Sequence, residues 1–199
     1  MDVPLLPLIG FAFAAAVTPG PNNALVAANA AANGWRATWP HMLGIGAGFA
    51  LMIVLVGLGL AGVLAAYPAV ARGMRWASMA WLAWLAWQIA MAPVGQGGEV
   101  PALRFGFVRA VLFQWVNPKA WLLALSIAAA WVRPEAALAP QLTVIGLVFF
   151  LVTVPSCLPW ALLGDGAARV LGGGARMRAF NIAMALLLVA SMLPIALEG

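Results

Sequence analysis

Charged residues are scarce in this sequence. Only 8% of the 199 residues are charged and 65% are hydrophobic, whereas a soluble domain usually has about 25% charged residues. A soluble globule with this composition could not cover its surface with polar side chains. A helix needs about 20 apolar residues to cross a bilayer, and several stretches meet that requirement. The composition predicts an all-α integral membrane protein with one transmembrane domain, residues 1–199.

Residues that bind metals or carry out covalent catalysis are also scarce. Cys157 is the only cysteine and His41 the only histidine, so the sequence offers no internal disulfide, no cysteine-based metal motif and no His–Glu metal motif. There is no convincing Ser–His–Asp set. The sequence therefore predicts no metal, no cofactor and no enzymatic activity. An intramembrane enzyme or a non-transporting membrane subunit stays the alternative to a transporter.

Positive charge is distributed unevenly between the loops. The formal net charge of +5 would suggest a nucleic-acid partner in a soluble protein, but here the arginines lie in short loops between apolar segments. The loops on one side carry Arg36, Arg104, Arg109, Arg169, Arg176 and Arg178, and those on the other carry Arg72, Arg75 and Arg133. Because cytoplasmic loops collect basic residues, we expect a cytoplasmic (inner) membrane protein with both termini outside and no nucleic-acid partner.

Hydropathy and loop markers predict six transmembrane helices. Their approximate ranges are 4–32, 42–66, 76–92, 105–132, 137–163 and 180–197. The N-terminal apolar stretch lacks the basic residues of a signal peptide, so we expect it to be retained. A glycine-rich linker near residue 97 separates two sets of three helices, and an odd number of helices inverts the second set. The sequence predicts two inverted repeats, residues 1–95 and 96–199, an architecture typical of secondary transporters.

The first and fourth predicted helices are each interrupted near mid-depth. Thr18-Pro19-Gly20-Pro21 places two prolines around a glycine, and Asn117-Pro118-Lys119 places one proline after an asparagine. A proline inside a helix removes a hydrogen bond and costs about 3 kcal/mol. We expect both helices to be broken there, with the freed backbone groups facing protein or a wet cavity. Breaks in corresponding helices of two repeats indicate a binding site at the midplane.

Polar side chains surround both predicted breaks. Asn22 and Asn23 follow the first break, and Gln114 lies one turn before the second. Lys119, the only lysine, lies in mid-span, where a charge costs about 2.5–3.5 kcal/mol and should face protein or water. Lys119 and the helix N-termini would attract a carboxylate, and the freed carbonyls would accept an ammonium. The predicted substrate site comprises Thr18, Pro19, Gly20, Pro21, Asn22, Asn23, Gln114, Asn117, Pro118 and Lys119.

Two ionisable residues outside the breaks are candidates for gating or proton coupling. His41 lies at the start of the second predicted helix and Asp165 at the end of the fifth, and no Asp or Glu lies in mid-membrane. If transport is coupled to protons, the proton carrier would be Asp165, Lys119 or the substrate itself. The alternating glycines Gly44, Gly46 and Gly48 favour close helix packing, which we expect to involve the break at Pro19.

These motifs resemble those of a known family. Thr18-Pro19-Gly20-Pro21-Asn22 and Asn117-Pro118-Lys119 are similar to the two signatures of the LysE/RhtB family of amino-acid exporters, and the resemblance covers nearly the whole chain. The stretch 114–121 looks like the branch that exports cysteine, O-acetylserine and related neutral amino acids. The resemblance implies efflux driven by the proton-motive force. The wider superfamily also exports metal ions and other solutes, and the sequence leaves homo-oligomerisation open.

Overall fold

Helices make up almost all of the chain that this computed structural model describes, which is residues 3–94, 104–133 and 135–193. The helices are α1 (Leu5–Val17), α2 (Pro21–Asn33), α3 (Trp39–Leu55), α4 (Ala61–Ala66), α5 (Pro68–Ala90), α6 (Phe107–Phe113), α7 (Pro118–Trp131), α8 (Leu138–Leu171) and α9 (Ala175–Ala190). A π-helical turn, Val56–Leu60, joins α3 to α4, and a 3₁₀ turn, Gln114–Val116, precedes α7. The described ranges contain no strand, which confirms the all-α prediction. The predicted linker and the repeat boundary at residues 95 and 96 lie outside the described residues.

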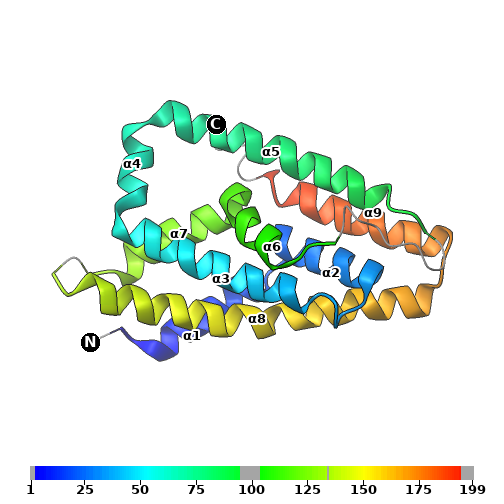
Figure 1. The fold of residues 1–199 in the computed structure, drawn as a ribbon, viewed down its shortest axis with the longest axis horizontal. Coiled ribbons are helices and arrows are strands. Elements are labelled where there is room, and N and C mark those ends of the chain that lie inside the picture. Colours follow the sequence, from blue (N-terminus) through cyan, green and yellow to red (C-terminus); the bar gives the residue numbers. More distant parts are fainter. Residues whose placement is uncertain (1–2, 95–103, 134, 194–199) are drawn as a thin grey trace.

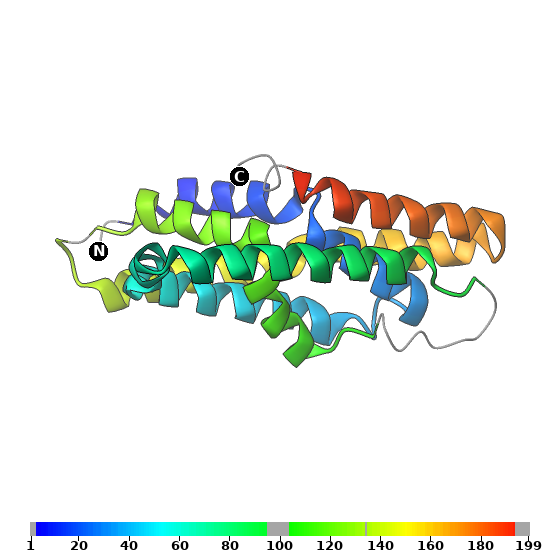
Figure 2. The same ribbon diagram turned by 90° about the horizontal axis from the view of Figure 1, so that it is seen from above.

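The helices run back and forth along one axis of the molecule (Figure 1). α1 and α2 together run in one direction, α3 returns beside α8, and α5 runs along the opposite edge, where it packs on α9. Seen from above, α1 and α9 lie along one side of the molecule and α3 and α6 along the other (Figure 2). α4 is turned across this axis, because the backbone changes direction at Gly59, whose φ of 113° favours glycine.

Length and hydropathy identify two or three candidate membrane spans among the described residues, where six are predicted. Two helical stretches, Trp39–Ala66 and Leu138–Leu171, are long and apolar enough to cross a bilayer, and α1 with α2 adds a third if the bent pair is one span. Large apolar side chains also face outward, such as Leu6 at 83% exposure and Leu151 at 65%. Soluble monomers rarely expose such surfaces, so a lipid environment explains them. The membrane prediction is confirmed in this coarser form, and the six spans stay a prediction.

The predicted bounds of three helices are wrong. The third and sixth helices were expected to begin near residues 76 and 180, but α5 begins at Pro68 and α9 at Ala175. The fifth helix was expected to stop at Leu163, but α8 continues to Leu171 and ends before Gly172, whose φ is 64°. Gly164 lies inside α8 and packs on α2, because a Cβ there would clash with the carbonyl of Ala27. Asp165 therefore lies inside α8 rather than at its end.

Close packing at the glycines of α3 is confirmed, although the partner differs from the prediction. A Cβ at Gly44 would clash with the carbonyl of Phe107, and one at Gly48 would lie 2.8 Å from the Cα of Val111. Both contacts are with α6, and those of Gly46 are with α8. The glycines therefore bring α3 against the half-helix before the second break, not against the break at Pro19.

Two apolar clusters meet where the helices are broken. One cluster contains buried side chains of α1, α3, α7 and α8, including Leu8, Met52 and Ile127. The other contains side chains of α2, α5, α6 and α9, including Leu25 and Leu85. The two halves of each broken helix belong to different clusters: α1 and α7 belong to the first, and α2 and α6 to the second. Burial of apolar side chains on both sides thus holds the two breaks at fixed positions between them.

Candidate functional site

The structure brings the two helix breaks into contact. α1 and α2 are bent by 56° at the first break, where Gly20 is extended, with φ 174°. At the second break Asn117 is extended between the 3₁₀ turn and α7. The Nζ atom of Lys119 donates hydrogen bonds to the carbonyl oxygens of Thr18 at 3.0 Å and Pro19 at 3.3 Å. Segments that lie about 100 residues apart in sequence thus form one polar region.

Side chains from other segments satisfy the carbonyl groups freed at the first break. Pro19 and Pro21 have no N–H, so the carbonyls four residues earlier lose their usual helical donors. The Nε1 atom of Trp160 in α8 donates to the carbonyl of Val17 at 3.2 Å. The Nδ2 atom of Asn23 donates at 2.9 Å to the carbonyls of both Ala16 and Thr18. Backbone polarity at this break is therefore satisfied partly by Asn23 in the adjoining helix and partly by Trp160, which the tertiary fold brings in.

A pair of side-chain amides joins the two breaks a second time. Asn22 Nδ2 donates to Gln114 Oε1 at 2.9 Å, and Gln114 Nε2 donates back to Asn22 Oδ1 at 3.2 Å. Gln114 Nε2 also donates to the carbonyl of Ala110 at 2.9 Å, and the side chain is fully buried. Asn22 and Gln114, singled out from sequence, are thus brought together across the two halves of the chain.

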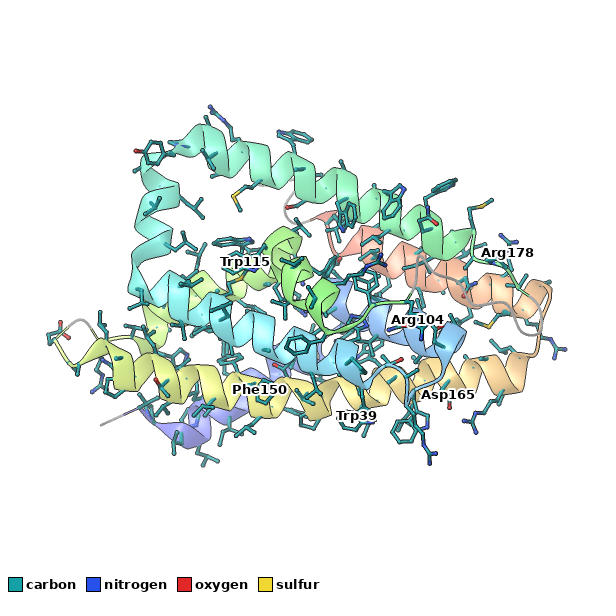
Figure 3. The ribbon with its side chains drawn as sticks, viewed as in Figure 1. Trp39, Arg104, Trp115, Phe150, Asp165 and Arg178 are labelled. Atoms are coloured by element: carbon teal, nitrogen blue, oxygen red, sulfur yellow. The ribbon has the colours of Figure 1, made fainter. Side chains whose placement is uncertain are left out.

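The second break satisfies its own backbone. Asn117 is the N-cap of α7, and its Oδ1 accepts a hydrogen bond from the backbone N–H of Lys119 at 3.1 Å, as expected of an asparagine there. Trp121 Nε1 donates to the carbonyl of Trp115 at 2.9 Å; Figure 3 shows Trp115 close to where α6 gives way to α7. Pro118 occupies the first turn of α7, where its missing N–H costs nothing.

A small cavity of about 50 Å³ lies between the breaks. Six residues of the predicted site line it: Thr18, Gly20, Asn22, Asn23, Asn117 and Lys119. Pro19, Pro21, Gln114 and Pro118 are not among the lining residues; they shape the breaks or support the lining side chains. The opposite wall is formed mainly by α3 and α8, through Ile45, Phe49, Phe149, Thr153 and Cys157.

Sequence reasoning missed the wall contributed by α8. Phe149, Thr153 and Cys157 follow one another at intervals of four residues, which places them on one face of a helix. A threonine and a cysteine one turn apart in an otherwise apolar helix are the signal that could have found this face. No local motif identifies Ile45 and Phe49, because they follow the same apolar pattern as the rest of α3.

The two coupling candidates lie away from this cavity. His41 is fully buried at the start of α3, where Asn29 Nδ2 lies 3.1 Å from His41 Nδ1 and the imidazole ring lies 5.1 Å from the ring of Phe105. Asp165 pairs with Arg169 at 2.7 Å, beside the loop that follows α2, and Figure 3 shows it toward the same end as Arg104 and Arg178. Over the described ranges, no three His, Cys, Asp or Glu side chains are grouped as a metal site would need.

Comparison with known proteins agrees with the resemblance seen in the motifs. The family model described as LysE type translocator matches residues 13–197. The cysteine/O-acetylserine efflux proteins of Escherichia coli (strain K12) and Shigella sonnei (strain Ss046) are each 30% identical over 175 residues, covering 87% of this chain and 88% of the relative. The protein of the same name in Escherichia coli O1:K1 / APEC is 29% identical over the same length, with the same coverage. No solved structure matches the chain.

Proposed function

Because this chain belongs to the LysE type translocator family, we propose that it exports small amino acids or their derivatives across the cytoplasmic membrane. The observation that carries the proposal is the cavity between the two helix breaks, where an ammonium, two backbone carbonyls and several amides converge. Irregular backbone at membrane depth is tolerated only inside protein or beside a wet cavity. A polar site of this kind suits a solute that carries both charges of an amino acid.

The residues around the breaks divide into groups that suit each end of a zwitterion. Lys119 and the N-terminus of α7 would attract the carboxylate. The carbonyls of Thr18 and Pro19 would accept hydrogen bonds from the ammonium. The amides of Asn22, Asn23 and Asn117 lie at the same cavity and would supply further donors and acceptors. Pro21, Gly20, Gln114 and Pro118 would set the geometry in which these groups meet.

The cavity dimensions favour a small side chain. A volume of about 50 Å³ holds a few non-hydrogen atoms beyond the space of a single water. The wall formed by Phe149, Thr153 and Cys157 offers apolar surface with one hydroxyl and one thiol, which suits a short and weakly polar side chain. The relatives are named for cysteine and O-acetylserine efflux, and both compounds have such side chains.

The packing of the helices supports the proposed inverted repeats. α3, the second helix of the first half, packs through Gly44 and Gly48 on α6, the broken helix of the second half. α8, the second helix of the second half, packs on α1, which is the half before the break in the first broken helix. In both cases the second helix of one half packs on the broken helix of the other half, as expected of two related halves. We propose six spans in this arrangement, with both termini outside the cytoplasm.

We also propose that transport is coupled to protons, and we select the proton-carrying residue from its position in the structure. Asp165 pairs with Arg169 within α8 and lies beside the loop between α2 and α3. His41 is enclosed by Asn29 and Phe105 and is not among the residues that line the cavity. We therefore favour Asp165, or the substrate itself, as the proton carrier.

Counterflow in proteoliposomes tests the proposed function. Vesicles with the purified protein are loaded with unlabelled amino acid, and the uptake of labelled L-cysteine, O-acetyl-L-serine, L-serine, L-leucine or L-arginine is measured outside. We expect uptake of the small neutral amino acids above that of empty vesicles and little uptake of arginine. Absence of exchange for every compound would favour the alternatives, a non-transporting membrane subunit or an exporter of another solute or metal ion.

A further inference from the structure

The ammonium group of Lys119 is held without an opposing charge. Its Nζ atom donates to the carbonyl pair, which we define as the carbonyl oxygens of Thr18 and Pro19, at 3.0 and 3.3 Å. Among the residues that the structure describes, no carboxylate lies within ion-pair distance of Lys119. Two carbonyl oxygens of a broken helix thus serve as a binding site for a primary ammonium, and the chain's own side chain fills it.

Gly20 fixes the width of this ammonium site. A Cβ atom on Gly20 would lie 2.9 Å from Lys119 Cδ and 3.2 Å from Nζ, so any larger residue would press on the lysine side chain. The absence of a side chain at Gly20 therefore leaves the room that the lysine side chain occupies beside the carbonyl pair. Thr18 and Pro19 are exposed and Lys119 is half-buried, so a small molecule that enters the adjoining cavity can reach the same carbonyl oxygens.

We propose that Lys119 is a tethered occupant of the site for the substrate's ammonium group, an inference that rests on the proposed function. An α-amino acid carries the same primary ammonium, so it replaces Lys119 on the carbonyl pair. The displaced Lys119 then meets the carboxylate of the same substrate molecule in the cavity that both line. When the substrate leaves, Lys119 returns to the carbonyl pair and rejoins the two breaks.

This exchange selects for molecules that carry both charges. A simple amine would displace Lys119 but leave two ammonium groups close together without an anion, which is unfavourable at membrane depth. A simple carboxylate would draw Lys119 away and leave the carbonyl pair without a donor. Only a zwitterion supplies both an ammonium for the carbonyl pair and a carboxylate for Lys119. The wild-type site is therefore expected to reject amino-acid derivatives in which either charge is blocked.

Chemical complementation of Lys119→Ala tests the tethered occupant. n-Propylammonium supplies the three carbons and the nitrogen that this substitution removes, and N,N,N-trimethylpropylammonium is a matched control without N–H donors. The unfolding temperature of the purified protein is measured with each compound. At about ten times its dissociation constant, n-propylammonium should raise the Tm of Lys119→Ala by about 3 °C, and it should leave the wild type unchanged. An equal shift in both proteins, an equal effect of the control compound, or no shift in the variant overturns the proposal.

A second measurement uses only the wild-type protein, so it tests the proposal even if Lys119→Ala does not fold. L-Cysteine, L-cysteine methyl ester and N-acetyl-L-cysteine are compared under reducing conditions for their effect on Tm. L-Cysteine should bind at least tenfold more tightly than either derivative, and a methyl ester that binds within twofold of it overturns the proposal. If L-cysteine itself has no effect, the proposed function fails, whereas complementation of Lys119→Ala still decides whether the carbonyl pair is an ammonium site.

Discussion

The two helix breaks differ in where their hydrogen bonds come from. At the first break the carbonyls of residues 16–19 are satisfied by Asn23, by Trp160 of α8 and by Lys119 of α7. At the second break the groups that satisfy the backbone are local: Asn117 caps α7, and Trp121 bonds to Trp115. We call the first break open, because two of the three side chains that satisfy it, Trp160 and Lys119, lie on distant helices. We call the second break closed, because its partners are local.

This difference assigns separate tasks to the two breaks. A break whose partners lie on other helices changes its hydrogen bonds whenever those helices move, which suits the part of a transporter that exchanges ligands. A break with local partners keeps its backbone shape, so α7 stays in place while the side chain of Lys119 moves between the carbonyl pair and the substrate. Two similar proline motifs thus have different tasks: the first break exchanges hydrogen-bond partners, and the second keeps its backbone shape. Each prediction below tests this contrast, from the largest expected effect to the smallest.

The largest effect should come from separating the first break from its support in α8. In Gly164→Leu the new side chain would clash with the backbone of Ala27 in α2. We expect a loss of about 3 kcal/mol or more of stability from overpacking, seen as loss of the monodisperse peak in size-exclusion chromatography. Gly166→Leu is the matched control, because a Cβ there meets nothing within 4 Å. Equal behaviour of the two variants would contradict the close contact.

Removing the link between the breaks should abolish transport and spare insertion. Lys119→Met keeps the length of the side chain but leaves the carbonyls of Thr18 and Pro19 without their donor. The variant also lacks the ammonium that would bind the substrate's carboxylate, so we expect counterflow to fall more than tenfold while the amount of protein in the membrane is unchanged. Undiminished export by Lys119→Met would show that the site lies elsewhere.

Asparagines at the two breaks should differ in their effect on stability. Asn23→Ala removes the donor to two carbonyls, those of Ala16 and Thr18, and should cost about 2–3 kcal/mol. Asn117→Ala removes one N-cap bond and should cost about 1 kcal/mol. Thermal unfolding of the two purified variants measures the difference. If Asn117→Ala is the more destabilising change, the open and closed breaks have been assigned the wrong way round.

The amide pair between the breaks should give the smallest effect. A double-mutant cycle with Asn22→Ala and Gln114→Ala isolates the reciprocal bonds at 2.9 and 3.2 Å. We expect a coupling free energy of about 0.5–1.5 kcal/mol in thermal unfolding. A cycle of Asn22→Ala with Thr143→Ala is the control, since the hydroxyl of Thr143 bonds only within α8. Coupling in the control cycle as large as in the first would mean that the amides do not act as a pair.

The sequence predicts the breaks and their polar residues because proline acts locally. Pro19, Pro21 and Pro118 remove backbone donors wherever the chain places them, so both interruptions can be located without a structure. The pairing of Asn22 with Gln114 depends on the packing of four helices, which no local pattern specifies. The end of α8 was missed for a related reason: only the contact of Gly164 with α2 reveals that this glycine is a packing residue inside the helix.

The cavity residues of α3 and α8 were not predicted from the sequence either. Phe149, Thr153 and Cys157 form a cavity wall only because α8 lies beside the first break. Lys119 was expected to attract a carboxylate, and the structure places its ammonium on the carbonyls that the sequence had offered to the substrate. Six of the residues that line this cavity were thus predicted from sequence, whereas the contacts among them were not.

Counterflow by Gly20→Val tests most directly whether the cavity between the breaks is the transport site. Gly20 lines the cavity beside Lys119, and its extended backbone accepts any residue, so a valine would fill the space without straining the chain. Gly10→Val in α1, where a Cβ meets nothing within 4 Å, controls for insertion and folding. We predict wild-type exchange of labelled small amino acids in Gly10→Val and none in Gly20→Val. Full exchange in Gly20→Val, at equal protein levels, would contradict the account.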